Sequence, residues 1–270
     1  MDFGTLVVKH NADAGFFSCY TIRLLHILLY FNQTKTCPRR IDSSNLFYQY
    51  KINVNQDTTY EYIKAHDSPN IEYSAPVRIT DDYREEQFSN YKNINFQMIK
   101  PFIYKYFYPS DAVLKKMSEL ETKYKMDYTN LAVFYYRGTD KCIETNLCEY
   151  SAYIERAEQI KKDNPNIQFL VVSDEMEMLR LFANRFPNTL VIEELIQHMG
   201  RSFEHSLWML ASVIVMSKAK HIVCSSGNVS LWIVLFRGHN NNIQQYLSPK
   251  EYIYGVKNKN YSNVETSFWI

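Results

Sequence analysis

The sequence predicts an α/β protein with two domains that face a cleft. The main observation is that the second half of the 270-residue chain alternates short apolar runs with amphipathic helical patterns. This spacing is typical of parallel βαβ units with right-handed crossovers. A similar strand, loop and helix pattern opens the chain, and the length suffices for two medium domains. We place the domains at residues 1–125 and 126–245, with a C-terminal tail at 246–270.

Before residue 126 the pattern predicts one β-loop-α unit followed by a loop-rich segment. Apolar periodicity marks the first strand and helix, whereas residues 33–82 have little periodicity and many turn formers. Ser110 and Asp111 are capping residues that open the last helix of this part. The predicted strands cover residues 6–8 and 46–50, and the predicted helices cover residues 18–31, 91–106 and 112–125.

After residue 126 strands and helices alternate regularly, which predicts a parallel sheet covered by helices. The predicted strands cover residues 131–136, 169–172, 190–192 and 221–224. The predicted helices cover residues 150–163, 177–186, 203–217 and 229–236. From residue 244 onward the sequence has no strong secondary-structure signal.

Composition limits the partners that the chain is expected to have. It has 30 basic and 29 acidic residues, so no overall charge directs it to nucleic acid or to an anionic membrane. Five scattered cysteines without a C-x-x-C pair predict reduced thiols rather than disulfides or a zinc site. With no apolar run of membrane-spanning length and no signal-peptide pattern at the start, we expect a soluble, cytoplasmic protein. The seven histidines lack the spacing of metal ligands, so no metal site is expected.

Polar residues follow three of the predicted strands. They are Arg137 to Lys141 after the first strand of the second half, Ser173 and Asp174 after the next, and Ser225 to Asn228 after the last. In a parallel sheet these loops meet at one edge, where α/β proteins bind ligands. Arg137 has the planar fork that suits a diphosphate, and the Ser-Ser-Gly-Asn loop presents hydroxyl and backbone N–H groups to an anion.

Each loop taken alone also fits an ordinary βα connection with helix-capping Ser or Asp residues. The meeting of all three at one edge favours a binding site. Because the chain has only seven glycines and neither a G-x-G-x-x-G nor a Walker motif, any nucleotide is held without a glycine-rich loop.

Three segments resemble conserved blocks of the fucosyltransferase superfamily, which includes the α-1,2-, α-1,6- and protein O-fucosyltransferases. Residues 135–141 resemble its His-x-Arg-Arg/Gly-x-Asp(-Lys) motif. Residues 169–175 resemble the next strand, which ends in Thr/Ser-Asp-Asp, and residues 216–232 resemble the last block. The blocks keep the family's order and spacing over about the second half of the chain. The first half is similar only through the loop at residues 14–17.

The resemblance implies a GT-B-like fold of two Rossmann-like domains and an inverting, metal-independent glycosyltransferase. The second domain would bind the nucleotide sugar, with GDP-fucose as the expected donor, and the first would bind the glycan acceptor. Arg137 would contact the diphosphate. The expected donor-binding residues are Gly15, Tyr135, Arg137, Lys141, Ser173, Asp174, Ser225, Ser226, Gly227 and Asn228.

Inverting transfer needs a cation for the departing diphosphate and a base for the acceptor hydroxyl. Arg137 fits the first role, and Asp140 and Glu144 are the nearest carboxylates for the second, although Asp140 equally fits a structural role that fixes Arg137. His205 and His221 fall near the same edge. Tyr135 stands where the family has a histidine.

Ser212 stands where the family has an acid that contacts guanine. The sequence therefore does not identify the nucleotide base of the donor. The alternative to an enzyme is a nucleotide- or glycan-binding protein that has lost catalysis. A phosphate-ester hydrolase is disfavoured, because no nucleophile or metal cluster accompanies Arg137.

Overall fold

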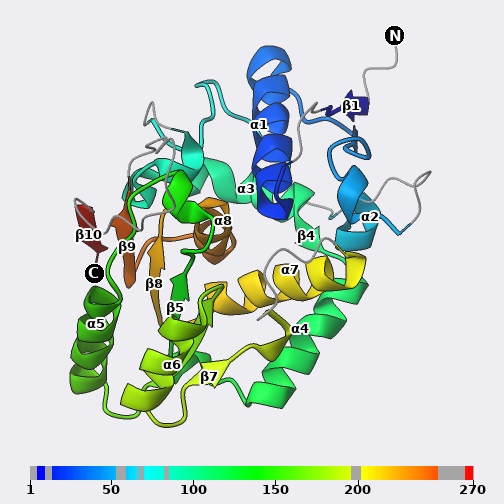
Figure 1. Cartoon of the computed structure of the whole chain (residues 1–270). Helices are drawn as coiled ribbons and strands as arrows, with labels where there is room; N and C mark the ends of the chain where they lie inside the picture. The colour runs from blue at the N-terminus through cyan, green and yellow to red at the C-terminus, as the bar shows by residue number, and fades with distance from the viewer. Residues whose placement is uncertain are drawn as a thin grey trace.

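The structure is a computed structural model, and it describes residues 5–9, 14–52, 59–64, 66, 70–81, 85–195 and 202–248, and the backbone of residues 265–269. Most of the predicted tail, and residues 53–58, 65, 67–69 and 82 of the loop-rich segment, lie outside these residues. The described part is a mixed α/β fold with one main sheet, as the sequence predicts (Figure 1).

The main sheet has six strands in the order β10-β9-β8-β5-β6-β7. Five of them are parallel, and β10 is antiparallel to β9 at one edge. The strands are β5 (Leu131–Tyr136), β6 (Gln168–Ser173), β7 (Leu190–Val191), β8 (His221–Ser225), β9 (Ile243–Leu247) and β10 (Glu265–Trp269). The carboxyl ends of β5, β6 and β8 therefore share one edge, which confirms that the three polar loops meet there.

Strand β5 lies at the centre of the sheet and is buried along its whole length. Its side chains alternate between two apolar clusters, because successive residues of a strand point to opposite faces. Phe134 packs in one cluster and Val133 in the other. This burial on both faces explains the continuous apolar run of the sequence.

Helices cover both faces of the sheet. Helices α5 (Tyr150–Asp163) and α6 (Met176–Arg185) supply the cluster around Phe134. Helices α7 (Phe203–Ser217) and α8 (Asn228–Arg237) supply the cluster around Val133. The sheet and its helices thus form three layers, with α5 and α6 on one face of the sheet and α7 and α8 on the other.

The part before residue 126 packs its helices onto the same core. Two small sheets accompany them, parallel β1–β2 and antiparallel β3–β4. The strands are β1 (Thr5–Val7), β2 (Arg40–Asp42), β3 (Ile63–Lys64) and β4 (Tyr108–Pro109). The helices are α1 (Phe16–Thr34), α2 (Thr59–Tyr62), α3 (Phe96–Tyr106) and α4 (Asp111–Tyr124).

A second Rossmann-like sheet is not found among the described residues of this part, whose strands are two or three residues long. Buried side chains from α1, α3 and α4 belong to the same apolar cluster as those from α7 and α8. The division at residue 126 and the arrangement as two facing domains remain predictions.

Three sequence predictions differ from the structure. The helix predicted to begin at residue 91 begins at Phe96, after a separate 3-10 turn (Tyr91–Asn93). Residues 46–50 form a turn that ends in a 3-10 helix (Tyr48–Tyr50) rather than a strand, and Phe47 and Tyr50 pack against the ring of Phe16. Strand β9 has no apolar pattern because Gln244 and Gln245 are buried within it. The Gln245 side chain makes three hydrogen bonds, to Ser89 and Tyr91 in one segment and to Ser226 in another, so both its oxygen and its nitrogen are satisfied in the core.

Two further findings bear on the predictions from composition. The five cysteines are free thiols, as predicted. In the described part of the chain, no helix combines the length and the apolar character that crossing a membrane requires.

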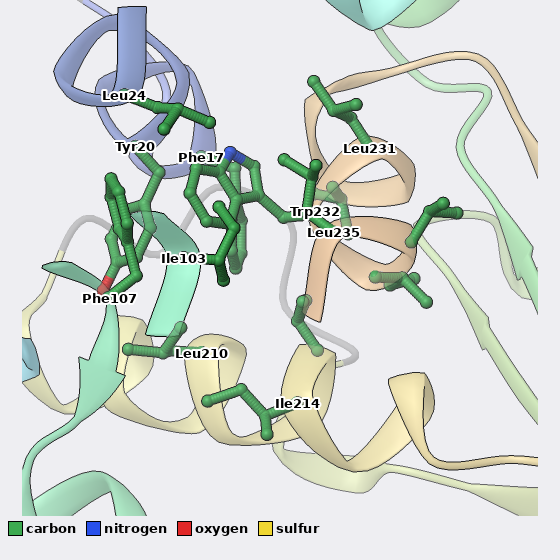
Figure 2. Close-up of a cluster of buried hydrophobic side chains, with 14 of the residues drawn as sticks. Phe17, Tyr20, Leu24, Ile103, Phe107, Leu210, Ile214, Leu231, Trp232 and Leu235 are labelled. Carbon is green, nitrogen blue, oxygen red and sulfur yellow. The ribbon is translucent and has the colours of Figure 1, made fainter. Parts of the chain in front are cut away.

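Trp232 joins the two parts of the chain within the core. Its ring lies 5.1 Å from that of Tyr20 on α1 and 4.6 Å from that of Phe107, between centroids, and Leu210 and Ile214 of α7 lie nearby (Figure 2). The indole Nε1 donates to Thr21 Oγ1 at 3.0 Å. Trp232 is fully buried, so α8 and α1 are held together by both ring packing and a hydrogen bond.

Trp232→Ala is expected to lower the free energy of unfolding by about 3 to 5 kcal/mol, because it leaves a large cavity in the core. Urea unfolding followed by circular dichroism measures the loss. Trp232→Phe keeps a ring and loses only the hydrogen bond and part of the volume, so it should cost clearly less. Equal losses for the two variants, or a negligible loss for alanine, would contradict the role of the ring.

Candidate active site

A cavity of about 350 Å³ opens at the carboxyl edge of the sheet. It is lined by the first turn of α1, by residues that follow β5 and β6, and by the first turns of α7 and α8. Nine of the twelve predicted site residues line it, which brings them together as the sequence predicts. They are Gly15, Tyr135, Arg137, Asp140, Lys141, Glu144, Ser173, Asp174 and Asn228.

Arg137 makes a two-bond fork with Asp140 immediately beyond β5. Its Nε donates to Asp140 Oδ1 at 2.9 Å and its Nη2 to Oδ2 at 2.5 Å. Burial alone would lower the pKa of Arg137, but the hydrogen bonds and charge of the Asp140 carboxylate, together with the charge of Asp174, raise it, so the guanidinium keeps its charge. Two of its five N–H donors are used in this fork, and the side chain still lines the cavity.

Asp174 fixes the loop that carries this arginine. Its Oδ1 accepts the backbone N–H of Gly138 at 2.9 Å, and its Oδ2 accepts that of Thr139 at 3.3 Å. Ser173 Oγ in turn accepts the backbone N–H of Glu175 at 3.0 Å at the start of α6. Ser173 and Asp174 therefore line the cavity, and their side-chain oxygens hold the backbone of the cavity wall in place.

Lys141 is a buried cation beside the fork. Its Nζ donates to Glu144 Oε2 at 2.6 Å and to Gln87 Oε1 at 3.1 Å, and it lies 4.6 Å from the centroid of the Phe88 ring. The side chain is only 4% exposed, and this burial lowers the pKa of Lys141, against the opposing effect of the Glu144 carboxylate. The Glu144 side chain is 36% exposed and also lines the cavity.

Asn228, the first residue of α8, ties the two parts of the chain together at the cavity. Its Oδ1 accepts from Thr21 Oγ1 at 2.8 Å, and its Nδ2 donates to Ser18 Oγ at 2.9 Å and to Gln87 Oε1 at 3.2 Å. The amide thus aligns the first turn of α1 with that of α8.

Ser225, Ser226 and Gly227 were predicted to receive an anion, but they do not line the cavity. Ser226 Oγ accepts from Gln245 Nε2 at 3.0 Å and from the backbone N–H of Ser248 at 3.1 Å. The Gly227 N–H donates to Tyr91 Oη at 3.0 Å. The polar groups of Ser226 and Gly227 are therefore used to hold strand β9, Ser248 and Tyr91, whereas Ser225 Oγ is buried without a hydrogen-bond partner among the described residues.

Helices α1 and α8 both begin at the cavity. Each has a glycine at its N-cap, Gly15 or Gly227, and neither has an acidic residue in its first turn. The N-terminal end of a helix carries a partial positive charge and backbone N–H groups without helical partners. Together with Arg137 and Lys141, these two helix ends make the cavity suited to an anion.

Tyr135 and Ser212 occupy different environments. Tyr135 lines the cavity, and burial raises the pKa of its phenol, so the side chain is neutral at physiological pH. Ser212 is fully buried in α7 and does not line the cavity.

His205 and His221, the two histidines that the sequence places near the site, lie at opposite ends of the strands of the main sheet. His205, in the first turn of α7, lines the cavity, and burial lowers its pKa. His221 begins β8 at the other edge of the sheet, where burial lowers its pKa to about 4, as do nearby cationic side chains. Only His205 is placed to act in the cavity.

Sequence reasoning missed several residues of the cavity wall. Gln87 comes from a 3-10 turn (Glu86–Phe88), and Tyr50 and Ser206 come from segments without a motif. These residues reach the site through tertiary packing, and no local pattern identifies them.

No group of three or more His, Cys, Asp or Glu side chains that could hold a metal ion occurs in the ranges that the structure describes. No protein-family model matches the chain, and a search of the curated proteins finds no match either.

Gly138 is required by close packing at the loop. A Cβ added there would meet Glu175 Oε1 at 2.5 Å and Tyr136 Cε1 at 2.7 Å. Gly138→Ala is therefore expected to lower the free energy of unfolding by about 1 to 3 kcal/mol, as overpacking does. Denaturant unfolding measures this loss.

Gly15→Ala is the matched control, because its new methyl group would meet only Ser18 Oγ at 3.7 Å. It should cost only about 0.5 to 1 kcal/mol, because alanine is a poorer N-cap residue than glycine but meets no close contact. A Gly138→Ala variant as stable as the control would show that the loop is looser than its contacts indicate.

Proposed function

We propose that the protein is an inverting, metal-independent glycosyltransferase of the fucosyltransferase kind. It would move a sugar, with fucose or a related deoxyhexose expected, from a nucleoside diphosphate to a glycan hydroxyl. The observation that supports this most strongly is that Arg137, Lys141 and the N-terminal ends of α1 and α8 line or border one cavity. All four carry positive charge or N–H donors, and a diphosphate is the anion that such a set suits.

Arg137 would stabilise the charge that develops on the diphosphate as the bond to the sugar breaks. Because its Nε–Nη2 edge is held by Asp140, the guanidinium needs little reorganisation when a ligand arrives. Lys141, held by Glu144 and Gln87, would add a second positive charge at the same end of the cavity.

The acceptor hydroxyl must lose a proton as it attacks the sugar. Glu144 and His205 both line the cavity, and the lowered pKa of His205 keeps its imidazole neutral and able to accept a proton. Asp140 has both oxygens in the fork with Arg137, which favours the positioning role over that of the base. We therefore propose Glu144 as the base, with His205 as the second candidate.

A GT-B-like arrangement, with the glycan acceptor bound by the part before residue 126, is included in this proposal, as is a cytoplasmic location. Gly15 and Ser18 bring that part to the cavity wall. Tyr135 stands in place of the histidine of the fucosyltransferases. The identity of the nucleotide base is therefore determined by the binding screen described next.

The test combines binding with turnover. GDP, UDP, ADP and TDP are screened by thermal shift, because a ligand that binds only the folded state raises the melting temperature. The sugar nucleotides of whichever base binds are then tested for release of nucleoside diphosphate. Arg137→Ala should lower turnover about a hundredfold to a thousandfold, the usual effect of removing one preorganised donor.

Arg185→Ala is the control, because Arg185 is an exposed arginine that lines a different cavity. It should leave turnover unchanged. Binding without any turnover would favour the alternative of a lapsed nucleotide- or glycan-binding protein. No shift with any nucleoside diphosphate, or full activity in Arg137→Ala, would overturn the proposal.

A further inference from the structure

A second cavity, of about 580 Å³, lies in the part of the chain before residue 126. No residue lines both this cavity and the candidate active site. Its described lining has one carboxylate, that of Glu72, and six cationic side chains. These are Arg23, Lys35, Arg39, Arg40, Lys64 and Lys105. Because the whole chain has a formal net charge of only +1, this cavity concentrates positive charge far beyond the average.

The cations are spread from the interior of the cavity to its surface. Arg23 is 3% exposed, its Nη1 donates to Ser43 Oγ, and its guanidinium lies 5.7 Å from the centroid of the Phe107 ring. Arg39 and Arg40 are exposed side chains. A ligand that enters would thus meet positive charge both at the rim and at the floor.

Carboxylates near the cavity offset part of this charge. The pKa of Asp42 is lowered by the backbone N–H of Ser44 and, to a smaller extent, by the positive charge of Arg40. Lys64 forms an ion pair with Asp111 at 2.5 Å, and Asp111 is almost fully exposed. Arg39 and Arg40 form no ion pair with any residue that the structure describes. Six cations that outnumber the carboxylates around them repel one another, and an anionic ligand would relieve that repulsion.

The walls of the cavity are held in place by hydrogen bonds. The backbone carbonyl of Pro38 accepts from Tyr106 Oη at 2.9 Å, and Lys35 Nζ donates to the carbonyl of Ser74 at 3.1 Å. The Asn32 amide makes hydrogen bonds of 2.8 and 2.7 Å to the carbonyl and N–H of Val77. Pro38 is thus fixed to α3, and the segment that holds Ser74 and Val77 is fixed to the end of α1, as in a pre-formed binding site.

We propose that this cavity is a second binding site, for a sugar-sized ligand that carries two or more phosphate, sulfate or carboxylate groups. The volume lies in the range of small-molecule sites, about 300 to 1,000 Å³. Tyr60, which is half exposed, lines the cavity with a flat apolar ring that a sugar or a base can pack against. The inference stands on this cavity alone and does not require the proposed transfer reaction.

Isothermal titration calorimetry at low salt tests the proposal with four probes: pyrophosphate, glucose 1,6-bisphosphate, a sulfated disaccharide and digalacturonic acid. The probes separate phosphate, sulfate and carboxylate as the recognised group. Arg39→Gln/Arg40→Gln should weaken the binding of at least one probe about tenfold, as the loss of two exposed charge contacts predicts. Both arginines are exposed, so the variant should fold.

Lys115→Gln/Arg180→Gln is the control, because it removes the same charge from exposed positions on α4 and α6, outside every cavity named above. It should bind the probes within about twofold of the unchanged chain, since screening limits distant charges. The proposal is overturned if no probe binds, or if both variants weaken binding equally. It is also overturned if only phosphatidylserine vesicles or duplex DNA bind in a manner that depends on Arg39 and Arg40.

Discussion

The fork between Arg137 and Asp140 is the interaction on which the candidate site depends. A cation at the end of a fully buried strand needs a counter-charge, and Asp140 supplies it through two hydrogen bonds that also fix the plane of the guanidinium. Asp174 accepts the N–H groups of Gly138 and Thr139, so the loop between strand and carboxylate is fixed as well. The cation is oriented by the protein itself, which is the condition for electrostatic catalysis.

The same site is where the two parts of the chain are joined. Gln87 accepts from both Lys141 and Asn228, and Asn228 is bonded to Ser18 and Thr21 of α1. Thr21 also accepts from the indole of Trp232, so the polar network at the cavity continues directly into the core. Packing between α1 and α8 therefore sets the width of the cavity as well as the stability of the fold.

Local patterns in the sequence predict the elements well where the pattern is long or sharply bounded. Strand β5 and helices α5 and α7 begin and end at the predicted residues. Strand β9 was not predicted, since its buried Gln244 and Gln245 break the apolar pattern. The site follows the same rule, because Arg137 was predicted from its place after a strand. The position of Gln87 beside Lys141 and the hydrogen bond from Gln245 to Ser226 depend instead on contacts between distant segments.

The central claim is that a nucleoside diphosphate binds at the carboxyl edge of the sheet, against Arg137. A crystal structure of the protein with the nucleoside diphosphate that raises its melting temperature most tests this claim directly. The account predicts diphosphate oxygens within hydrogen-bonding distance of the Arg137 guanidinium, between the first turns of α1 and α8. A diphosphate bound elsewhere, with Arg137 still engaged only by Asp140, would contradict it.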